Sequence, residues 1–148
     1  RRAQLPNVRL AVADALAPPL APGRRFDLVL VDAPCTGLGT LARRADLRWR
    51  VQETDAARLG VLAGRLLDAA AGAVEPGALL VYSTCTTEPE ENEEVVARFL
   101  DRDARFRVVP PERPVPPGAL GPDGLVRVLP EVHGCDGAFA ACLRRIDG

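Results

Sequence analysis

The chain has 148 residues, of which 47% are hydrophobic and 26% are charged, a composition that suits one globular domain with a modest core. Its formal net charge of −1 excludes the protein-wide positive field of a general nucleic-acid binder, so any basic contact has to be local. No apolar run approaches the roughly 18 residues of a membrane span and no signal peptide opens the chain, which predicts a soluble, cytoplasmic protein without a membrane partner.

Hydrophobic spacing predicts alternating strands and helices in the first half of the chain. Residues 8–14 alternate like a strand, and residues 26–32 form a nearly continuous apolar strand. Leucines and alanines recur at helical spacing over residues 54–74, and the Glu-Pro-Gly sequence at 75–77 is expected to end that helix. Residues 78–84 form the next buried strand.

The second half of the chain opens with another predicted helix. Thr87 offers an N-cap with Glu90 three residues later, a capping-box pattern, and the helix is expected to run to about Asp101. A short strand, a proline-rich loop and a closing strand follow: residues 105–109, 110–124 and 137–145. Strands that alternate with helices predict a largely parallel α/β sheet.

Cysteine usage indicates free thiols rather than a metal site or a disulfide framework. No C-x-x-C pair is present, so zinc spacing is absent and no metal is expected, and disulfides are unusual in a cytoplasmic chain. Cys142 lies inside the closing strand and is expected in the core. Cys135 shares a loop with His133, and this lone histidine is expected to be structural. The four cysteines are Cys35, Cys85, Cys135 and Cys142.

Two of these cysteines follow strands that we expect to be neighbours. Cys35 comes three residues after Asp32, and Cys85 directly follows the strand 78–84. Ligands bind beyond the carboxyl ends of parallel strands, so both thiols are expected to face one crevice with Asp32 at its rim. An ionised thiol there can attack an electron-poor carbon, and the helix N-terminus after Cys85 would favour ionisation. The alternative interpretation is structural, with buried apolar cysteines and Asp32 as a turn cap.

Two segments resemble the signatures of one enzyme family. "DAPCTGLGT" and "YSTCTTEPEENE" are similar to the signature segments of the Sun-type RNA (cytosine-5) methyltransferases, and the similarity extends from "VAD" at 12–14 through "DLRW" at 46–49 to "HGCDGAFAACL". The resemblance implies a Rossmann-like class I S-adenosylmethionine-dependent methyltransferase fold. It also implies S-adenosylmethionine as the cofactor and RNA, ribosomal rather than transfer RNA, as the substrate.

The resemblance implies a role for each site residue. Cys85 is expected to attack carbon 6 of cytosine, which makes carbon 5 nucleophilic enough to take the methyl group. Cys35 is expected to help the elimination that frees the product. Asp32 is expected to hydrogen-bond the ring near nitrogen 3 and to lie close to the cofactor, and Asp14 to contact the cofactor's adenine.

The pair of thiols also favours RNA over DNA as the substrate. The DNA enzymes attack with the Pro-Cys thiol, whereas a Pro-Cys together with a Thr-Cys resembles the RNA enzymes. The target base has to be unstacked and presented to the crevice. Candidates for phosphate contact follow Cys35, with a solvated surface as the alternative interpretation: Arg43, Arg44, Arg48 and Arg50.

The resemblance does not include the N-terminal part of the family's catalytic domain. The family's glycine-rich cofactor loop and its ribose-binding acid have no counterpart in the chain, which contains no methionine and begins at Arg1. We therefore expect residues 1–148 to be a single incomplete domain, the C-terminal part of a catalytic domain and inactive alone.

In the family's strand order, 3-2-1-4-5-7-6, residues 8–14 are the third strand and lack a natural partner. They are expected to pair abnormally, to be loosely held or to need another chain, and unpaired edges favour self-association. Strands 4-5-7-6 are expected to form a half-sheet.

Two other functions remain open at this stage. The chain could be a non-catalytic RNA-binding or assembly module descended from such an enzyme. It could instead be a thiol hydrolase or redox enzyme that uses Cys85, although His133 is its only histidine and no convincing catalytic partner for the thiol is apparent.

Overall fold

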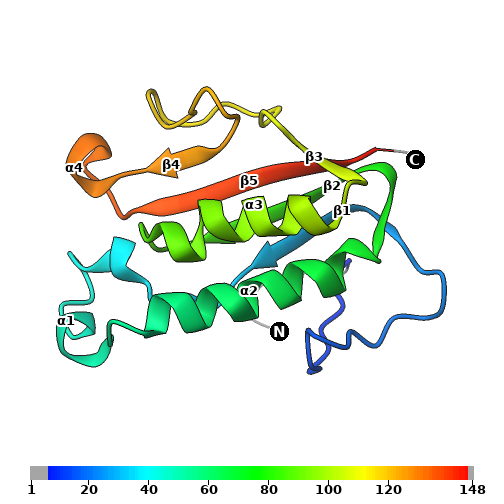
Figure 1. Cartoon of the computed structure of the whole chain (residues 1–148), viewed down its shortest axis with the longest axis horizontal. Coiled ribbons are helices and arrows are strands. Elements are labelled where there is room, and N and C mark those ends of the chain that lie inside the picture. The colour runs from blue at the N-terminus through cyan, green and yellow to red at the C-terminus, as the bar shows by residue number, and fades with distance from the viewer. Residues whose placement is uncertain (1–6, 147–148) are drawn as a thin grey trace.

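A computed structural model describes residues 7–146 of the chain, so residues 1–6 and 147–148 of the expected domain lie outside the described residues. One five-stranded sheet carries helices α2 and α3 side by side on one face (Figure 1). The strands are β1 (Phe26–Asp32), β2 (Val74–Thr84), β3 (Phe106–Val109), β4 (Val126–Val128) and β5 (Ala138–Arg145). The α-helices are α1 (Leu47–Arg50), α2 (Asp55–Ala71), α3 (Glu93–Arg102) and α4 (Pro130–His133), and short 3-10 turns are η1 (Leu38–Thr40) and η2 (Pro89–Glu91).

The sheet has the order β1-β2-β5-β3, and β4 pairs with the other end of β5. Strands β1 and β2 are parallel, whereas β5 runs antiparallel to β2, β3 and β4. This order corresponds to the expected half-sheet 4-5-7-6. The parallel pair places the ends of β1 and β2 at one edge of the sheet, which is where the cysteine loops begin.

The core lies between the sheet and the two long helices. Helix α2 turns its small and aliphatic residues toward the strands and α3 adds branched and aromatic ones, so both helices are amphipathic. On the sheet side, Leu80 and Tyr82 of β2 and Leu143 of β5 are fully buried. The buried helix residues are Ala63, Leu67, Ala71, Val95, Val96 and Phe99.

Two predicted elements have different bounds in the structure. Helix α2 ends at Ala71, because the chain re-enters the sheet at Val74 and the Glu-Pro-Gly sequence belongs to β2. The extra residues are accommodated by an irregularity in the β1–β2 register between Phe26 and Leu28. Gly77 has a φ of 78°, a conformation that glycine adopts without strain.

The predicted strand at residues 8–14 is wrong. The segment has no regular secondary structure and its side chains are exposed, Val12 fully. Apolar and polar residues alternate there, but a strand is stable only with a hydrogen-bonded neighbour, and none of residues 7–146 supplies one for this segment. The expectation that residues 8–14 would lack a natural partner agrees with this.

The predicted helix start at Thr87 is also wrong. Helix α3 begins at Glu93, and the turn η2, opened by Pro89, comes before it. Thr87 Oγ1 contacts only the neighbouring Glu88 carboxylate, at 3.5 Å, so no capping box forms. Sequence spacing also missed the short elements α1, α4 and β4.

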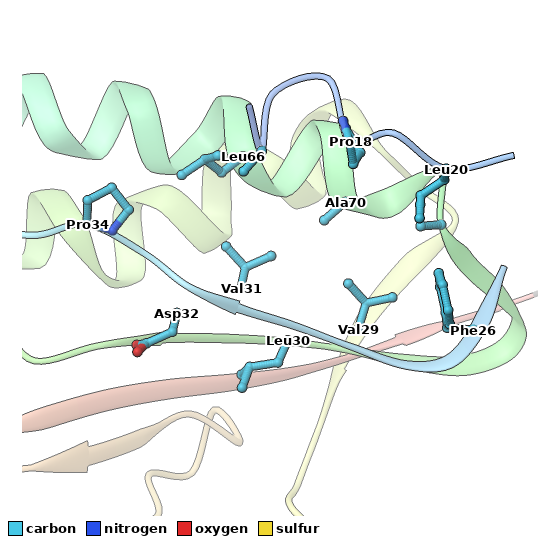
Figure 2. Close-up of a pocket in the computed structure, with 12 residues that line it drawn as sticks. Pro18, Leu20, Phe26, Val29, Leu30, Val31, Asp32, Pro34, Leu66 and Ala70 are labelled. Atoms are coloured by element: carbon cyan, nitrogen blue, oxygen red, sulfur yellow. The ribbon is translucent and has the colours of Figure 1, made fainter. Parts of the chain in front are cut away.

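The two faces of the sheet differ in their cover. In β1, Val29 and Val31 point toward α2, whereas Leu30 and Asp32 point to the opposite side (Figure 2). On that opposite side Leu28 and Leu30 are 58% and 63% exposed. Leu30 pairs with Val81 of β2, and Val81 pairs with Cys142 of β5. Cys142 is only half-buried, which corrects its expected place in the core.

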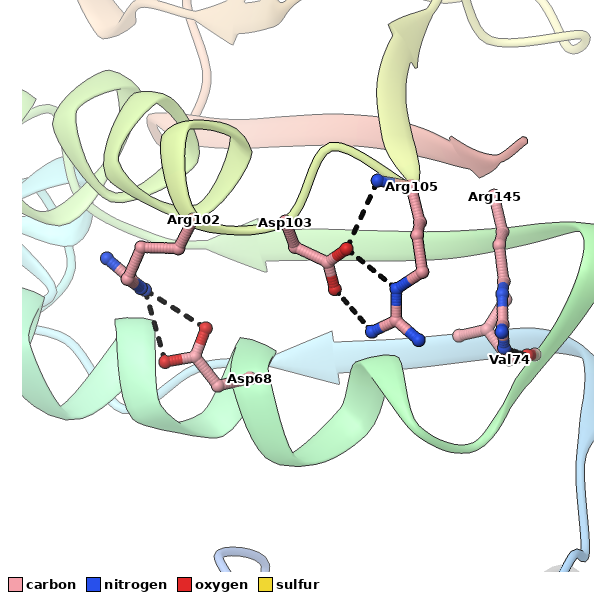
Figure 3. A network of polar contacts seen from close by, with 6 residues as sticks. All are labelled: Asp68, Val74, Arg102, Asp103, Arg105 and Arg145. Atoms are coloured by element: carbon pink, nitrogen blue, oxygen red, sulfur yellow. Dashed lines mark hydrogen bonds and ion pairs between the residues drawn. The ribbon is translucent and has the colours of Figure 1, made fainter. Parts of the chain in front are cut away.

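Ion pairs close the far end of the helical layer (Figure 3). Arg102 of α3 contacts the Asp68 carboxylate of α2 at 3.0 and 3.1 Å, and Arg105 binds Asp103 in the turn before β3. The Arg105 guanidinium lowers the pKa of Asp103. Arg145 donates to the Val74 carbonyl at the start of β2. Exposed pairs of this kind contribute about 0–1 kcal/mol each, so they add little to the stability of the fold.

Two glycines of α2 provide a matched test of the packing. A Cβ added at Gly60 would lie 2.2 Å from the Glu90 carbonyl oxygen, whereas one at Gly64 would lie in ordinary contact, 3.6 Å from the end of the Arg102 side chain. Gly60→Ala is expected to lower the free energy of unfolding by about 2 kcal/mol through overpacking. Gly64→Ala is expected to raise it by about 0.5–1 kcal/mol through helix propensity. Urea unfolding of both variants measures the difference, and equal stability would contradict the close approach of η2 to α2.

Candidate active site

The candidate site is built from the loops that leave β1 and β2. The strands are parallel neighbours, so their carboxyl ends meet, and the Ala33 N–H donates to the Ser83 carbonyl at 2.9 Å where the first loop begins. The Cys35 and Cys85 Sγ atoms lie 3.4 Å apart. The structure therefore brings together the two thiols that the sequence predicted to face one crevice.

Glycines allow the loop backbones to approach each other. Gly39 donates its N–H to the Cys85 carbonyl at 3.1 Å, and Gly137 donates to the Gly39 carbonyl at 2.8 Å. A Cβ at Gly39 would lie 2.7 Å from the Gly137 oxygen and 2.9 Å from the Cys85 oxygen, distances that no side chain tolerates. Gly37 begins the η1 turn with a φ of 73°.

A buried carboxylate joins the two loops through side chains. Glu91 is 1% exposed, and its oxygens accept hydrogen bonds from the Thr36 N–H at 2.7 Å and the Thr36 hydroxyl at 2.6 Å. The Thr36 hydroxyl also lies 3.0 Å from the hydroxyl of Thr86. The two threonines directly follow Cys35 and Cys85, so the contact links the residues next to the thiols. Sequence reasoning missed all three residues.

The residues around Glu91 are fixed by further hydrogen bonds. The Tyr82 hydroxyl donates to the Glu91 carbonyl, and burial raises the pKa of Tyr82 well above its usual value. The Asn92 side chain accepts from the Thr84 hydroxyl at 2.6 Å and donates to the Thr86 carbonyl at 3.1 Å. Asn92 thus holds the residues on both sides of Cys85.

The two thiols differ in environment. Burial, with the Cys85 thiol beside it, raises the pKa of Cys35 to about 11, whereas Cys85 is exposed. The helix N-terminus expected directly after Cys85 is not there, because α3 begins at Glu93. Arg44 and Cys85 both lie next to Gly37: a Cβ added there would be 3.6 Å from Arg44 Nη1 and 3.8 Å from Cys85 Sγ.

Asp32 and Cys35 line different hollows. Asp32 accepts a hydrogen bond from the Ser83 hydroxyl at 2.9 Å and lines an apolar hollow of about 320 Å³ with Pro34 and Leu66 (Figure 2). Cys35 lines a separate hollow of about 240 Å³. Asp32 and Cys35 thus line separate hollows, and the expectation of one crevice with Asp32 at its rim stays a prediction.

Asp14 lies in an exposed turn. Its carboxylate accepts a hydrogen bond from the Leu16 N–H at 2.9 Å. The next residue, Ala15, lines the same apolar hollow as Asp32. Asp14 itself is not among the residues that line this hollow, and no strand carries it.

The candidate arginines lie in three different environments. Arg44 and Arg50 line the hollow beside Cys35, together with Arg58, which sequence reasoning missed. Arg43 is instead ion-paired with Asp136, which fastens η1 to the loop before β5. Arg48 is exposed, and next to it Trp49 is 86% exposed on α1.

Other chemistries find little support in the described residues. Leu129 donates its N–H to His133 Nδ1 at 3.0 Å, so this histidine is held within its own helical turn. No cluster of potential metal ligands occurs within residues 7–146. Over the same residues, none of the helices has the length and apolar character needed to cross a bilayer.

Comparison with known proteins identifies relatives over nearly the whole chain. The sequence pattern of the family "16S rRNA methyltransferase RsmB/F" matches residues 1–144. The "Probable ribosomal RNA small subunit methyltransferase B" of Synechocystis sp. is 39% identical over 98% of this chain and 33% of its own length. The "Ribosomal RNA small subunit methyltransferase B" of Thermus thermophilus is 46% identical over 83% of this chain and 30% of its own length.

A solved structure agrees with these relatives. NSun6 from Pyrococcus horikoshii, crystallised with the S-adenosylmethionine analogue SFG, is 30% identical with a TM-score of 0.80, over 97% of this chain and 36% of its own. The chain thus spans about a third of the length of the proteins that it matches. The match to residues 1–144 and the shared fold place the chain in the RsmB/F family of 16S rRNA methyltransferases.

Proposed function

We propose that the chain is the C-terminal part of the catalytic domain of an S-adenosylmethionine-dependent RNA (cytosine-5) methyltransferase, and that it carries the nucleophile. The observation that carries the proposal is the 3.4 Å separation of the Cys35 and Cys85 Sγ atoms at the ends of two parallel strands. Two sulfur atoms at this distance can both reach the same pyrimidine ring. The family membership supports RNA as the substrate.

Cys85 is assigned as the attacking thiol. Its Sγ adds to carbon 6 of cytosine, which interrupts the aromatic conjugation and makes carbon 5 nucleophilic enough to accept the methyl group. Cys85 is exposed, so a base presented by the RNA can reach its Sγ. In the release step the bond between carbon 6 and the Cys85 Sγ breaks and carbon 5 loses its proton. Cys35 is protonated at neutral pH, because its pKa is about 11, and its Sγ lies 3.4 Å from that of Cys85. It is assigned to pass its proton to the departing Cys85 sulfur and to take up the proton of carbon 5 in return.

The apolar hollow beside Asp32 fits part of the family's cofactor. S-adenosylmethionine supplies an activated methyl group when bound, and its adenine is a flat, largely apolar group. The hollow of about 320 Å³ is lined mainly by apolar side chains, with the Asp32 carboxylate at one end and Ala15, next to Asp14, at another. Asp14 and Asp32 are the residues assigned to the cofactor, and Asp32 additionally orients the cytosine near nitrogen 3.

The basic hollow beside Cys35 is assigned to the RNA backbone. Arg44 and Arg50 are the strongest candidates for phosphate contact, since both line this hollow. Arg48 is exposed next to them. Arg43 would have to leave Asp136 first, and Arg50 its exposed contact with Asp46 at 3.2 Å. Cytosine has to leave its stack to reach the thiols, which favours a loop or an opened helix of ribosomal RNA as the target.

The two thiols are distinguished by replacing each in turn in the full-length protein. Cys35→Ala is expected to accumulate a protein–RNA adduct that survives denaturing electrophoresis, because attack proceeds while elimination stalls. Cys85→Ala is expected to abolish both the adduct and methyl transfer to RNA. An adduct that forms with Cys85→Ala and not with Cys35→Ala would reverse the two roles.

Alkylation rates test the difference between the two thiols. At pH 8 iodoacetamide is expected to modify Cys85 at least about tenfold faster than Cys35, because thiolate is the reacting form and the raised pKa keeps Cys35 protonated. The Cys35 rate should then rise about tenfold per pH unit up to about pH 11, as the thiol ionises. Mass spectrometry of tryptic peptides separates the two sites, since Arg43 and Arg65 lie between them. Equal rates at pH 8 would contradict the assignment.

The isolated chain is expected to be inactive, because its residues include only part of the cofactor site. Calorimetry with S-adenosylmethionine should give no measurable heat of binding for the 148-residue chain, whereas a full-length protein should bind. Micromolar affinity of the isolated chain would show that the apolar hollow suffices.

A further inference from the structure

We propose that Glu91 is a positioning residue that sets the separation of the two thiols, a role that rests on the proposed function. Its carboxylate holds Thr36, and Thr36 contacts Thr86, at 2.6 Å and 3.0 Å respectively. Each threonine is covalently next to a cysteine, so a shift of either hydroxyl moves a thiol. Nothing in the family membership assigns a function to Glu91.

The direction of the hydrogen bonds follows from the chemistry of the carboxylate. Glu91 only accepts, so the N–H and the hydroxyl of Thr36 both point at it. The Thr36 oxygen is then left to accept, and the Thr86 hydroxyl supplies the proton across the 3.0 Å contact. The chain of donors therefore runs from Thr86 through Thr36 to Glu91, and every step of it crosses from one loop to the other.

Burial makes this chain stiff. Glu91, Thr36 and Thr86 are 1%, 6% and 1% exposed, so water cannot easily replace any of the three partners. A buried carboxylate without donors is strongly unfavourable, which opposes separation of the loops. The other end of Glu91 is also held, because its carbonyl accepts from the Tyr82 hydroxyl inside the core.

Glu91 could instead serve only general stability, and substitutions separate the two roles. Glu91→Leu keeps much of the side-chain volume but leaves both Thr36 donors without an acceptor. Glu91→Gln keeps one acceptor for the Thr36 N–H, and its amide can donate to the Thr36 hydroxyl, so the loops stay connected with the hydrogen bond reversed. Leu67→Ala is the matched control, since Leu67 is fully buried on α2 and forms no part of the hydrogen-bond chain.

The effective concentration of the two thiols toward each other measures their positioning directly. In a chain with Cys135→Ser and Cys142→Ala, glutathione disulfide oxidises the Cys35 and Cys85 thiols to one disulfide and is itself reduced to two glutathione thiols, which receive the two protons. The equilibrium constant gives the effective concentration and needs neither RNA nor cofactor. Chromatography of the oxidised and reduced chain supplies the ratio, and circular dichroism verifies that each variant is folded.

Glu91→Leu is expected to lower the effective concentration at least about tenfold, whereas Glu91→Gln and Leu67→Ala should stay within about threefold of the parent. Thr86→Val removes the donor on the Cys85 side without leaving Glu91 unpaired and is expected to lower it about fivefold. If Glu91→Leu does not fold, Thr86→Val decides the question.

An unchanged equilibrium in the folded Glu91→Leu variant, or in Thr86→Val when Glu91→Leu does not fold, overturns the positioning role. A drop in Leu67→Ala equal to that in Glu91→Leu also overturns it, because general loss of stability would then explain both. Failure of the proposed function is seen separately, as methylation of RNA that survives Cys85→Ala in the full-length protein.

Discussion

One buried carboxylate connects the loops that follow β1 and β2. Glu91 takes both hydrogen-bond donors of Thr36, and Thr36 contacts Thr86, which lies 50 positions further along the chain. Burial of an unsatisfied carboxylate costs several kcal/mol, so the folded loops and the buried acid stabilise each other. The close approach of the loop backbones at Gly39 reinforces the same arrangement. The proximity of the two thiols is a result of these contacts.

Parts of the fold that depend on apolar spacing were predictable from the sequence. Strands β1 and β2, helix α2 and the meeting of the two cysteines followed from strong apolar patterns, whereas the order of the half-sheet came from the resemblance to the family. Features that depend on distant partners were not. Residues 8–14 alternate like a strand but pair with no neighbour among residues 7–146. Glu91 stands in a run of glutamates that looks solvated, and its burial and its contacts with Thr36 distinguish it from Glu93 and Glu94.

The two hollows of the site differ in chemistry, although consecutive residues of the chain line them. Pro34 lines the apolar hollow with Asp32, whereas Cys35 lines the hollow that contains Arg44 and Arg50. Under the proposed function, the cofactor occupies the first hollow and the RNA backbone the second. This arrangement keeps a flat apolar group and a polyanion in surroundings that suit each of them.

The placement of the chain's single tryptophan and single tyrosine decides what its intrinsic fluorescence can report. Trp49 is 86% exposed between two arginines near the basic hollow, whereas Tyr82 is completely enclosed in the core. An indole that is already in water changes its emission little when the protein denatures, but it is quenched when a nucleobase stacks on it. Tryptophan emission therefore reports ligand binding near α1. Unfolding of the core has to be followed through tyrosine fluorescence.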